Sequence, residues 1–193
     1  MIESPASPTV SRFRSGRRRP VWLCALLVLA LLFHPALAAA AEGPSGLQLP
    51  RFATTRSNPI NVRVGPGTRY DIAWVYVKPG TPVEIVQEFD TWRKIRDYDG
   101  SEGWVHQSLL SGRRAGLAAP WRDGEQIPLR TSRSSDGGVR AYLGPGFRVE
   151  ISRCDGKWCD VTAIARLDGR SANYSGYLPQ DELWGVYEGE AFD

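Results

Sequence analysis

The sequence predicts an all-β protein made of two small β-barrels in tandem, preceded by a cleaved signal peptide. Three observations lead to this fold class. Residues 58–112 contain short runs rich in β-branched and aromatic residues, separated by glycine, proline and aspartate turns. A similar order of runs and turns returns over residues 127–188. Residues 1–41 are basic, then apolar, then rich in alanine, as in a secretory leader.

The leader predicts an exported protein. Five arginines precede the apolar residues 21–33, and residues 36–41 supply small side chains at A-x-A positions. The apolar run is shorter than the roughly 20 residues of a membrane span, although an uncleaved amino-terminal anchor is the alternative interpretation. Cys24 lies inside the run without a preceding small residue, which argues against a lipoprotein. We expect a periplasmic or extracellular location and no stable membrane span after cleavage.

The net charge gives no support to nucleic acid as a partner. The chain has 24 Lys and Arg against 21 Asp and Glu. The leader contains five of the arginines and one acid, so residues 42–193 carry 19 basic and 20 acidic groups. A net charge of −1 lacks the bulk electrostatic attraction that phosphate backbones or anionic membranes require.

Two segments are predicted to connect the structured parts of the chain. Residues 42–57 are rich in Gly, Pro, Ser and Thr and predict a flexible lead-in. Residues 113–126 predict a linker between the two barrels, and we expect Trp121 within it to pack against one of them because large rings are usually buried.

The first barrel is predicted strand by strand. Strands are expected over residues 72–77, 82–89 and 92–98, and a short one over residues 103–105, followed by one helical turn over residues 106–110. Alternation over residues 82–89 places Val83, Ile85 and Phe89 on one face and Glu84 and Glu88 on the other. Val86 interrupts this alternation, which indicates either a bulge or a strand covered on both sides.

Trp92 is predicted to face away from the core. It stands three residues before Ile95, and regular alternation sends the two side chains to opposite faces of the sheet. A bulge between them would cancel this argument. The six tyrosine and tryptophan residues from Tyr70 to Trp104 exceed what so small a core accommodates, and we expect Trp74 and Trp104 to be the buried ones.

Four motifs in residues 58–112 resemble the bacterial SH3-like (SH3b) domain family. These motifs are the N-V-R-x-G-P-G opening at residues 61–67, a P-G turn leading to Val83, the W-x-K-I strand at residues 92–95 and the G-W-V closing strand at residues 103–105. They cover the whole unit in the family's order. The resemblance implies an SH3-like β-barrel that binds cell-wall peptidoglycan or a protein.

The second barrel is predicted to be a divergent copy of the first. Residues 144–151 match residues 78–85, Trp158 matches Trp92, and Gly176-Tyr177-Leu178 matches Gly103-Trp104-Val105. The copy departs from the family pattern in its opening loop, where residues 134–138 replace the Gly-Pro-Gly segment. We therefore expect the fold to be kept and leave its ligand open.

Cys154 and Cys159 are expected to form a disulfide across a hairpin. They flank a four-residue connection, and the exported compartment permits oxidation. Zinc binding and redox catalysis are the alternatives. Zinc requires about four ligands, whereas residues 42–193 hold these two thiols and one histidine, His106. Redox motifs favour a shorter spacing at a helix start.

The sequence contains no motif for catalysis, a metal or a cofactor. A Ser-His-Asp or Cys-His site would have to use His106, which follows the closing strand and is expected to make structural hydrogen bonds. We therefore predict a non-enzymatic protein and leave an enzyme that depends on His106 as a further alternative.

Binding is expected on exposed aromatic side chains of the first barrel. The candidate residues are Arg63, Tyr70, Tyr76 and Trp92. The predicted partner is peptidoglycan or an envelope peptide or protein. The alternative is a structural or assembly protein of the envelope in which the two barrels dock on each other, with Trp121 between them.

Overall fold

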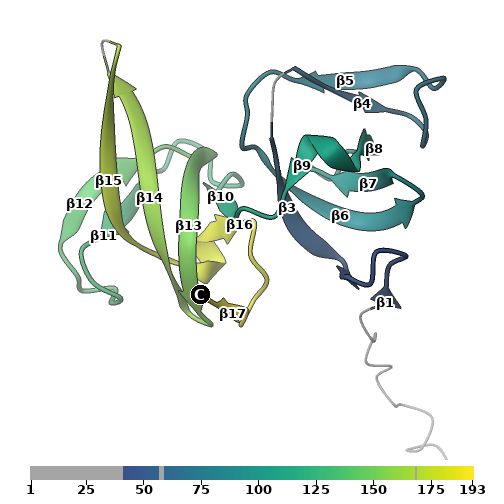
Figure 1. The fold of residues 1–193 in the computed structure, drawn as a ribbon. Helices are drawn as coiled ribbons and strands as arrows, with labels where there is room; N and C mark the ends of the chain where they lie inside the picture. Colours follow the sequence, from purple (N-terminus) through teal and green to yellow (C-terminus); the bar gives the residue numbers. More distant parts are fainter. Residues whose placement is uncertain (1–40, 57–58, 168) are drawn as a thin grey trace, which may run out of the picture. The chain divides into compact units, whose positions relative to one another are not determined.

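The computed structural model describes residues 41–56, 59–167 and 169–193, which belong to one compact unit, Ala40–Asp193. These residues form strands and two short 3-10 helices but no α-helix (Figure 1). The prediction of an all-β protein is therefore confirmed. The predicted signal peptide lies outside the described residues except for Ala41. Within the described ranges, no helical segment has the length and hydropathy that crossing a membrane demands.

The strands form two large sheets and one small hairpin. The hairpin pairs β1 (Ala41–Glu42) with β2 (Gln48–Leu49). We call the first sheet, with its 3-10 helix, the first unit. It consists of β3 (Arg51–Thr55), β4 (Ile60–Arg63), β5 (Ile72–Tyr76), β6 (Pro82–Phe89), β7 (Trp92–Arg96), β8 (Glu102–His106), η1 (Gln107–Leu109) and β9 (Leu110–Ser111).

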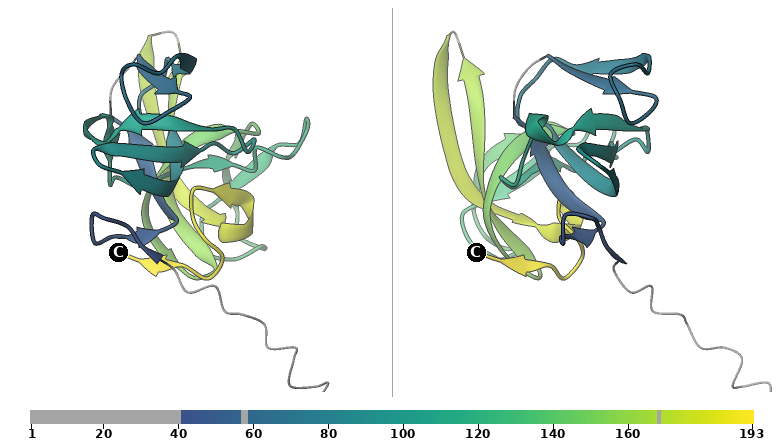
Figure 2. Two further views of the ribbon diagram at one scale, coloured as in Figure 1. Left: turned by 90° about the vertical axis from the view of Figure 1, so that its right-hand side faces the viewer. Right: turned by 45° about the vertical axis from the view of Figure 1, so that its right-hand side comes forward.

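The second sheet, with its own 3-10 helix, is called the second unit. It consists of β10 (Ala115–Ala118), β11 (Ile127–Arg130), β12 (Val139–Leu143), β13 (Phe147–Asp155), β14 (Trp158–Leu167), β15 (Arg170–Pro179), η2 (Gln180–Glu182), β16 (Leu183–Trp184) and β17 (Ala191–Phe192). Its β14–β15 hairpin is paired over all ten residues of each strand and extends beyond the rest of the sheet (Figure 2).

The two sheets have the same strand order. The first runs β5-β4-β8-β7-β6-β3-β9, and the second runs β12-β11-β15-β14-β13-β10-β16, with β17 added beside β13. Each strand of the first unit thus has a counterpart at the same place in the second, and η2 follows β15 as η1 follows β8. The register shifts are also shared, because β4 and β11 each shift register against their hairpin partner before their last residue.

A bulge in β6 decides which side chains enter the core. The register of β6 against β7 shifts between Ile85 and Gln87, as the interrupted alternation at Val86 indicated. Beyond the shift the faces exchange. Glu88 is therefore buried and Phe89 is 57% exposed, so the predicted assignment of these two residues is wrong. The second unit has the same bulge between Ile151 and Arg153.

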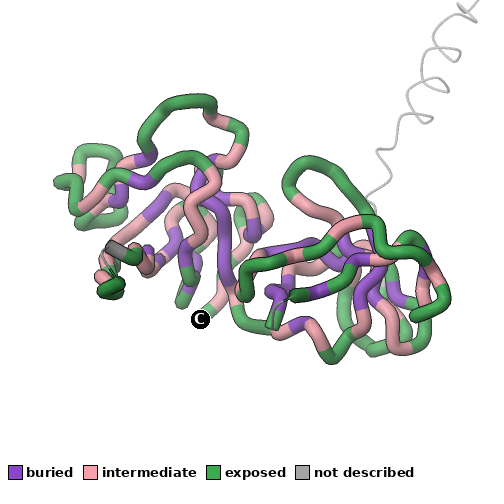
Figure 3. The backbone as a smooth tube through the Cα atoms, turned by 90° about the horizontal axis from the view of Figure 1, so that it is seen from above, coloured by how far each residue is buried: buried purple, intermediate pink, exposed green. Residues whose placement is uncertain are grey.

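Each unit has its own core of aliphatic side chains, and Figure 3 marks the buried residues along the backbone. The core of the first unit is formed by Ala53, Ile60, Val62, Val83, Ile85, Ile95, Val105 and Leu110, with Trp74 and Tyr76 packed against it. In the second unit the corresponding positions are largely held by Ile127, Leu129, Val149, Ile151, Val161, Leu178 and Leu183. Residues in turns are mostly exposed, and the buried residues lie mostly along the strands.

The predicted lead-in and linker each contain the first strand of a unit. Arg51–Thr55 forms β3, which pairs with β6 and β9. Ala115–Ala118 forms β10, which pairs with β13 and β16 and is buried at every residue. The prediction of a flexible lead-in is therefore wrong for Arg51–Thr55, and the predicted linker includes a buried strand of the second unit. The residues of β10 are Ala, Gly and Leu, which have weak strand preference, and tertiary pairing overrides it. The residues of β3 include Phe52, Thr54 and Thr55, which do favour strands.

After the bulge, the same pair of opposite residues forms an ion pair in the first unit and a disulfide in the second. In the first unit Glu88 is opposite Arg93, and its carboxylate also binds Arg51 and both the backbone and the side chain of Ser45. In the second unit the corresponding pair is Cys154 opposite Cys159. These cysteines are joined in a disulfide, as predicted, with a Cα–Cα distance of 4.1 Å.

The two units contact each other through side chains that sequence reasoning did not single out. The Phe52 ring lies 4.7 Å from Tyr187 and 5.1 Å from Trp184, between ring centroids. The Tyr187 hydroxyl donates to Glu84 Oε1 at 2.9 Å. Trp121 is 55% exposed, so the prediction that it packs against one of the units is wrong.

Candidate binding surface

Strand pairing aligns one row of side chains across five strands of the first unit. Residues directly opposite on paired strands project from the same face of a sheet. The aligned residues are Ile72, Arg63, Trp104, Lys94 and Gln87. Their chain neighbours Val62, Val105 and Ile95 lie in the core. The row therefore occupies the opposite side of the sheet, which we call the outer face.

Trp92 belongs to the adjacent row of the outer face. It is paired with Phe89 on one side and His106 on the other. β7 continues without a bulge, and its burial alternates, so Trp92 lies on the opposite face from Ile95 as predicted. The Trp92 ring meets the His106 ring edge-on at 5.7 Å and remains partly exposed.

Trp104 forms the base of this surface. It is only 9% exposed, as expected, but its pairing with Arg63 and Lys94 places it on the outer face. The surface thus has one buried indole flanked by two cations, with a partly exposed indole in the next row. Aromatic rings with nearby cations provide apolar area and hydrogen-bond donors to a ligand.

Arg63 fixes the opening loop beside the outer face. Its Nη1 donates to the Tyr70 carbonyl oxygen at 2.6 Å, and the Val64 amide donates to the Asp71 carbonyl at 3.0 Å. The loop is therefore closed upon itself. Gly65 is required here because a Cβ at this position would lie 2.5 Å from the Tyr70 ring.

Tyr70 presents its hydroxyl at the edge of this loop. Arg69 Nη2 donates to the hydroxyl at 3.2 Å, and the Arg69 guanidinium lies 5.1 Å from the ring centroid. Tyr70 is partly exposed. Tyr70 is thus linked to Arg63 through its backbone carbonyl, while Arg63, Trp104 and Trp92 lie on the same face of the sheet.

Tyr76 is separated from the other three candidates. It is paired with the buried Ile60 and packs against the core. Its hydroxyl donates to Asp97 Oδ2 at 2.6 Å. Burial, followed by this hydrogen bond, raises the pKa of Tyr76 above its usual value. A hydroxyl held in this way is occupied within the protein.

His106 makes the structural hydrogen bonds that the sequence suggested. Its Nδ1 lies 2.7 Å from the Ser108 hydroxyl and accepts from the Ser108 amide at 3.3 Å, which caps η1. A serine hydroxyl is thus within reach of an imidazole. Among the described residues, however, no carboxylate hydrogen-bonds to His106 to orient it. The described part of the chain also has no cluster of three potential metal ligands.

The corresponding loop of the second unit has the same backbone hydrogen bonds. Arg130 Nη1 donates to the Gly137 carbonyl at 3.0 Å, as Arg63 does to the carbonyl of Tyr70. The Thr131 amide donates to the Gly138 carbonyl at 2.8 Å. The loop conformation is therefore retained, although a glycine stands where the first unit has Tyr70.

One arginine covers the outer face of the second unit. Arg133 stands at the position of Pro66, and its guanidinium lies 5.3 Å from the Tyr177 ring centroid. It also forms an ion pair with Asp160 at 2.8 Å. Tyr177 and Asp160 are the counterparts of Trp104 and Lys94. The side chain of Arg133 thus lies over the outer face of the second unit, where Tyr177 is partly exposed, whereas Trp104 in the first unit is 9% exposed.

Comparison with known proteins supports the resemblance for the first unit. Residues 56–112 match the family model described as bacterial SH3 domain. This match covers less than half of the chain and does not include the second unit. A search of curated proteins finds no match.

Two solved structures from Trichomonas vaginalis are similar to the chain. The structure of NlpC2 has 14% identity and a TM-score of 0.29, and the match covers 72% of this chain and 49% of that one. The structure of NlpC1 has 16% identity and a TM-score of 0.28, with 75% and 48% covered. The chain therefore spans about half the length of these two proteins.

Proposed function

We propose that the protein is an exported, non-enzymatic binding protein that recognises peptidoglycan or an envelope peptide through the outer face of the first unit. The observation that carries this proposal is that strand pairing puts Arg63, Trp104 and, one row further, Trp92 on the same face of the first unit, beside the loop of Tyr70. The match of residues 56–112 to bacterial SH3 domains supports a binding role.

The composition of the surface suits a ligand that combines apolar groups with carboxylates. Trp92 and the exposed Phe89 provide rings that stack on sugars or pack on peptide side chains. Arg63 and Lys94 provide positive charge beside them, although Lys94 shares its charge with Glu102. Peptidoglycan offers both sugar rings and peptide carboxylates. Tyr76 is not part of the proposed surface, because its hydroxyl is engaged by Asp97.

We further propose that the second unit is a divergent copy that does not bind the same ligand. The shared strand order and the shared hydrogen bonds of the opening loop support common ancestry of the two units. Arg133 over Tyr177 occupies the surface where a ligand would lie.

Co-sedimentation with purified cell-wall sacculi tests the binding role. The protein is expected to pellet with sacculi, and Trp92→Ala together with Tyr70→Ala is expected to abolish this. Each aromatic contact at a binding hot spot contributes about 2 kcal/mol. Trp121→Ala is the matched control, since it removes an equally large exposed ring outside the surface. Thermal unfolding should change little, because Trp92 lies outside the core.

Either of two results would contradict the proposal. If the protein does not pellet, the wall is not its partner. If Trp92→Ala lowers thermal stability strongly and leaves pelleting unchanged, the indole has a structural role. The alternative of a structural envelope protein is favoured by the contacts of Phe52 with Trp184 and Tyr187. This alternative predicts that Phe52→Ala impairs the structural role of the protein in the envelope, while Trp92→Ala does not.

A further inference from the structure

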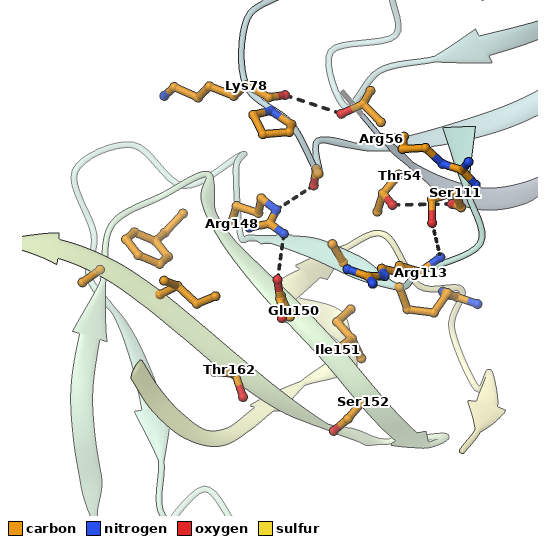
Figure 4. A pocket seen from close by; sticks show the side chains of 18 of the residues that line it. Thr54, Arg56, Lys78, Ser111, Arg113, Arg148, Glu150, Ile151, Ser152 and Thr162 are labelled. Atoms are coloured by element: carbon orange, nitrogen blue, oxygen red, sulfur yellow. Dashed lines mark hydrogen bonds and ion pairs between the residues drawn. The ribbon is translucent and has the colours of Figure 1, made fainter. Parts of the chain in front are cut away.

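A cleft of about 1450 Å³ lies between the first unit and the β14–β15 hairpin (Figure 4). The first unit contributes the ends of β3 and β9 and the turn from Lys78 to Gly80. The second unit contributes β13 and β14. Arg148 spans the cleft at one point, where its Nε donates to the Gly80 carbonyl at 2.6 Å. This cleft is separate from the outer face of the first unit.

The cleft opens where β14 leaves β13. The two strands are paired as far as Val149 and Ala163, whereas β14 remains paired with β15 up to Leu167 and Arg170. Residues 164–167 therefore have a second edge that pairs with none of the described strands. Side chains of this segment, including Ile164 and Ala165, line the cleft. Free edges of this kind accept an additional strand.

The cleft carries an excess of positive charge. Four cationic side chains at its wall are exposed and make no ion pair or hydrogen bond with the described residues. They are Arg56, Lys78, Arg113 and Arg166. Glu150 is the one acidic residue in the described lining, and it is already paired with Arg148 at 3.1 Å. The surplus contrasts with the net charge of −1 over residues 42–193.

Apolar side chains lie between these charges. Phe147, Ile151 and Ile164 line the same cleft, and hydroxyls of Ser152 and Thr162 lie beside them (Figure 4). A peptide strand projects its side chains alternately to two sides. It can thus place apolar side chains against the ring of Phe147 while its acidic side chains meet the cations. A simple polyanion would leave the apolar lining and the free edge unused.

We propose that this cleft binds an extended acidic peptide segment of a partner protein, which adds as a strand to the free edge of β14. Backbone hydrogen bonds to residues 164–167 hold the segment. Its carboxylates pair with Lys78, Arg113 and Arg166, and Arg56 extends the positive wall. Charge complementarity of this kind accelerates association and sets the orientation of the peptide.

A decapeptide of alternating glutamate and valine is the probe for this site. Titration calorimetry on the protein is expected to show binding that weakens with salt. Amide hydrogen exchange should slow at every second residue of 164–167, since alternate amides of a strand point to each edge. Lys78→Glu with Arg166→Glu is expected to weaken binding by about tenfold or more. Arg140→Glu with Arg170→Glu, on exposed arginines outside the cleft, is the matched control.

Three results would overturn the proposal. The first is no binding of the acidic peptide. The second is binding without slowed exchange at residues 164–167, which places the peptide elsewhere. The third is equal binding of inorganic polyphosphate, which identifies a general polyanion site. The outcome is independent of the proposed wall binding, because Trp92→Ala leaves the cleft unchanged and the charge reversals leave the outer face unchanged.

Discussion

The two units stabilise the same pair of strand positions, directly after the shared bulge, with different interactions. In the first unit the position is held by Glu88 opposite Arg93, and in the second by the disulfide of Cys154 and Cys159. A buried carboxylate requires further partners, and Arg51 and Ser45 supply them. The ion pair thus recruits the segment before β4 into the first unit. A disulfide is neutral and needs no such partners.

The outer faces differ in an equally local way. In the second unit Arg133, at the position of Pro66, extends over Tyr177, whereas in the first unit Trp104 is buried and Trp92 is partly exposed. The backbone of the two loops is hydrogen-bonded alike. The residue at this one loop position therefore places a charged side chain over the outer face of the second unit, which a proline cannot do.

The largest expected effect comes from removing the buried carboxylate. The Glu88 side chain has no exposed surface. Glu88→Ala therefore leaves the guanidinium of Arg93, and in part that of Arg51, buried without a counter-charge. Breaking a buried ion pair from one side costs about 3–5 kcal/mol. We expect amide exchange in β7 to accelerate accordingly. Exchange in β14 should change much less if the two units unfold separately.

Glu102→Ala is the control for this prediction, since its partner Lys94 and Glu102 itself are each about a third exposed. The expected loss in the free energy of unfolding for Glu102→Ala is at most about 1 kcal/mol.

The pH dependence of stability in acid provides a second measurement on Glu88. Burial alone would raise the pKa of Glu88, but hydrogen bonds from Arg51 and Ser45 outweigh it and lower the pKa.

Because the folded pKa is lowered, the ionised form stabilises the folded state above the ordinary carboxyl pKa, and this stability is lost as the pH falls through the folded value. Glu88→Gln should reduce the acid sensitivity of β7. An unchanged acid profile, or equal losses for Glu88→Ala and Glu102→Ala, would show that the ion pair does not support the first unit.

The disulfide is expected to have the next largest effect. Cys154→Ser with Cys159→Ser opens a loop of only a few residues, so the loss should be about 2 kcal/mol, toward the low side for disulfides. Exchange in β14 should accelerate, and a reducing agent should produce the same change in the parent protein. If β7 loosens by the same amount, the two units unfold as one cooperative domain through contacts such as Tyr187 with Glu84.

Much of the first unit was predictable because its strands have strong local signals. The disulfide and the outward position of Trp92 follow from spacing and alternation, and the bulge is one of the two alternatives that the interruption at Val86 left open. The burial of Glu88 did not follow, because one extra residue in β6 exchanges the faces after it, and alternation alone predicts the opposite. The interruption at Val86 was the available signal.

The missed elements have weak local signals and depend on distant partners. β10 is a strand because β13 offers an edge to it, not because of its small residues, and β3 pairs with β6 in the same way although Phe52, Thr54 and Thr55 also favour a strand. For the same reason, sequence reasoning did not find the cleft. Its walls come from separate segments of the chain, and no spacing rule links Lys78 to Arg166. Sequence reasoning did not single out Arg133 either.

The smallest expected effect tests the comparison of the two outer faces. Arg133→Ala removes ion pairs that are about one-third exposed and screened by solvent, so the free energy of unfolding should fall only slightly. The exposure of Tyr177 should nevertheless rise, because the guanidinium no longer covers its ring. Chemical modification of tyrosines with mass-spectrometric readout measures this directly. Arg153→Ala, which removes an exposed ion pair with Asp193, is the matched control. If Tyr177 remains as protected as before, another part of the second unit covers it, and the two outer faces differ by more than the residue at the position of Pro66.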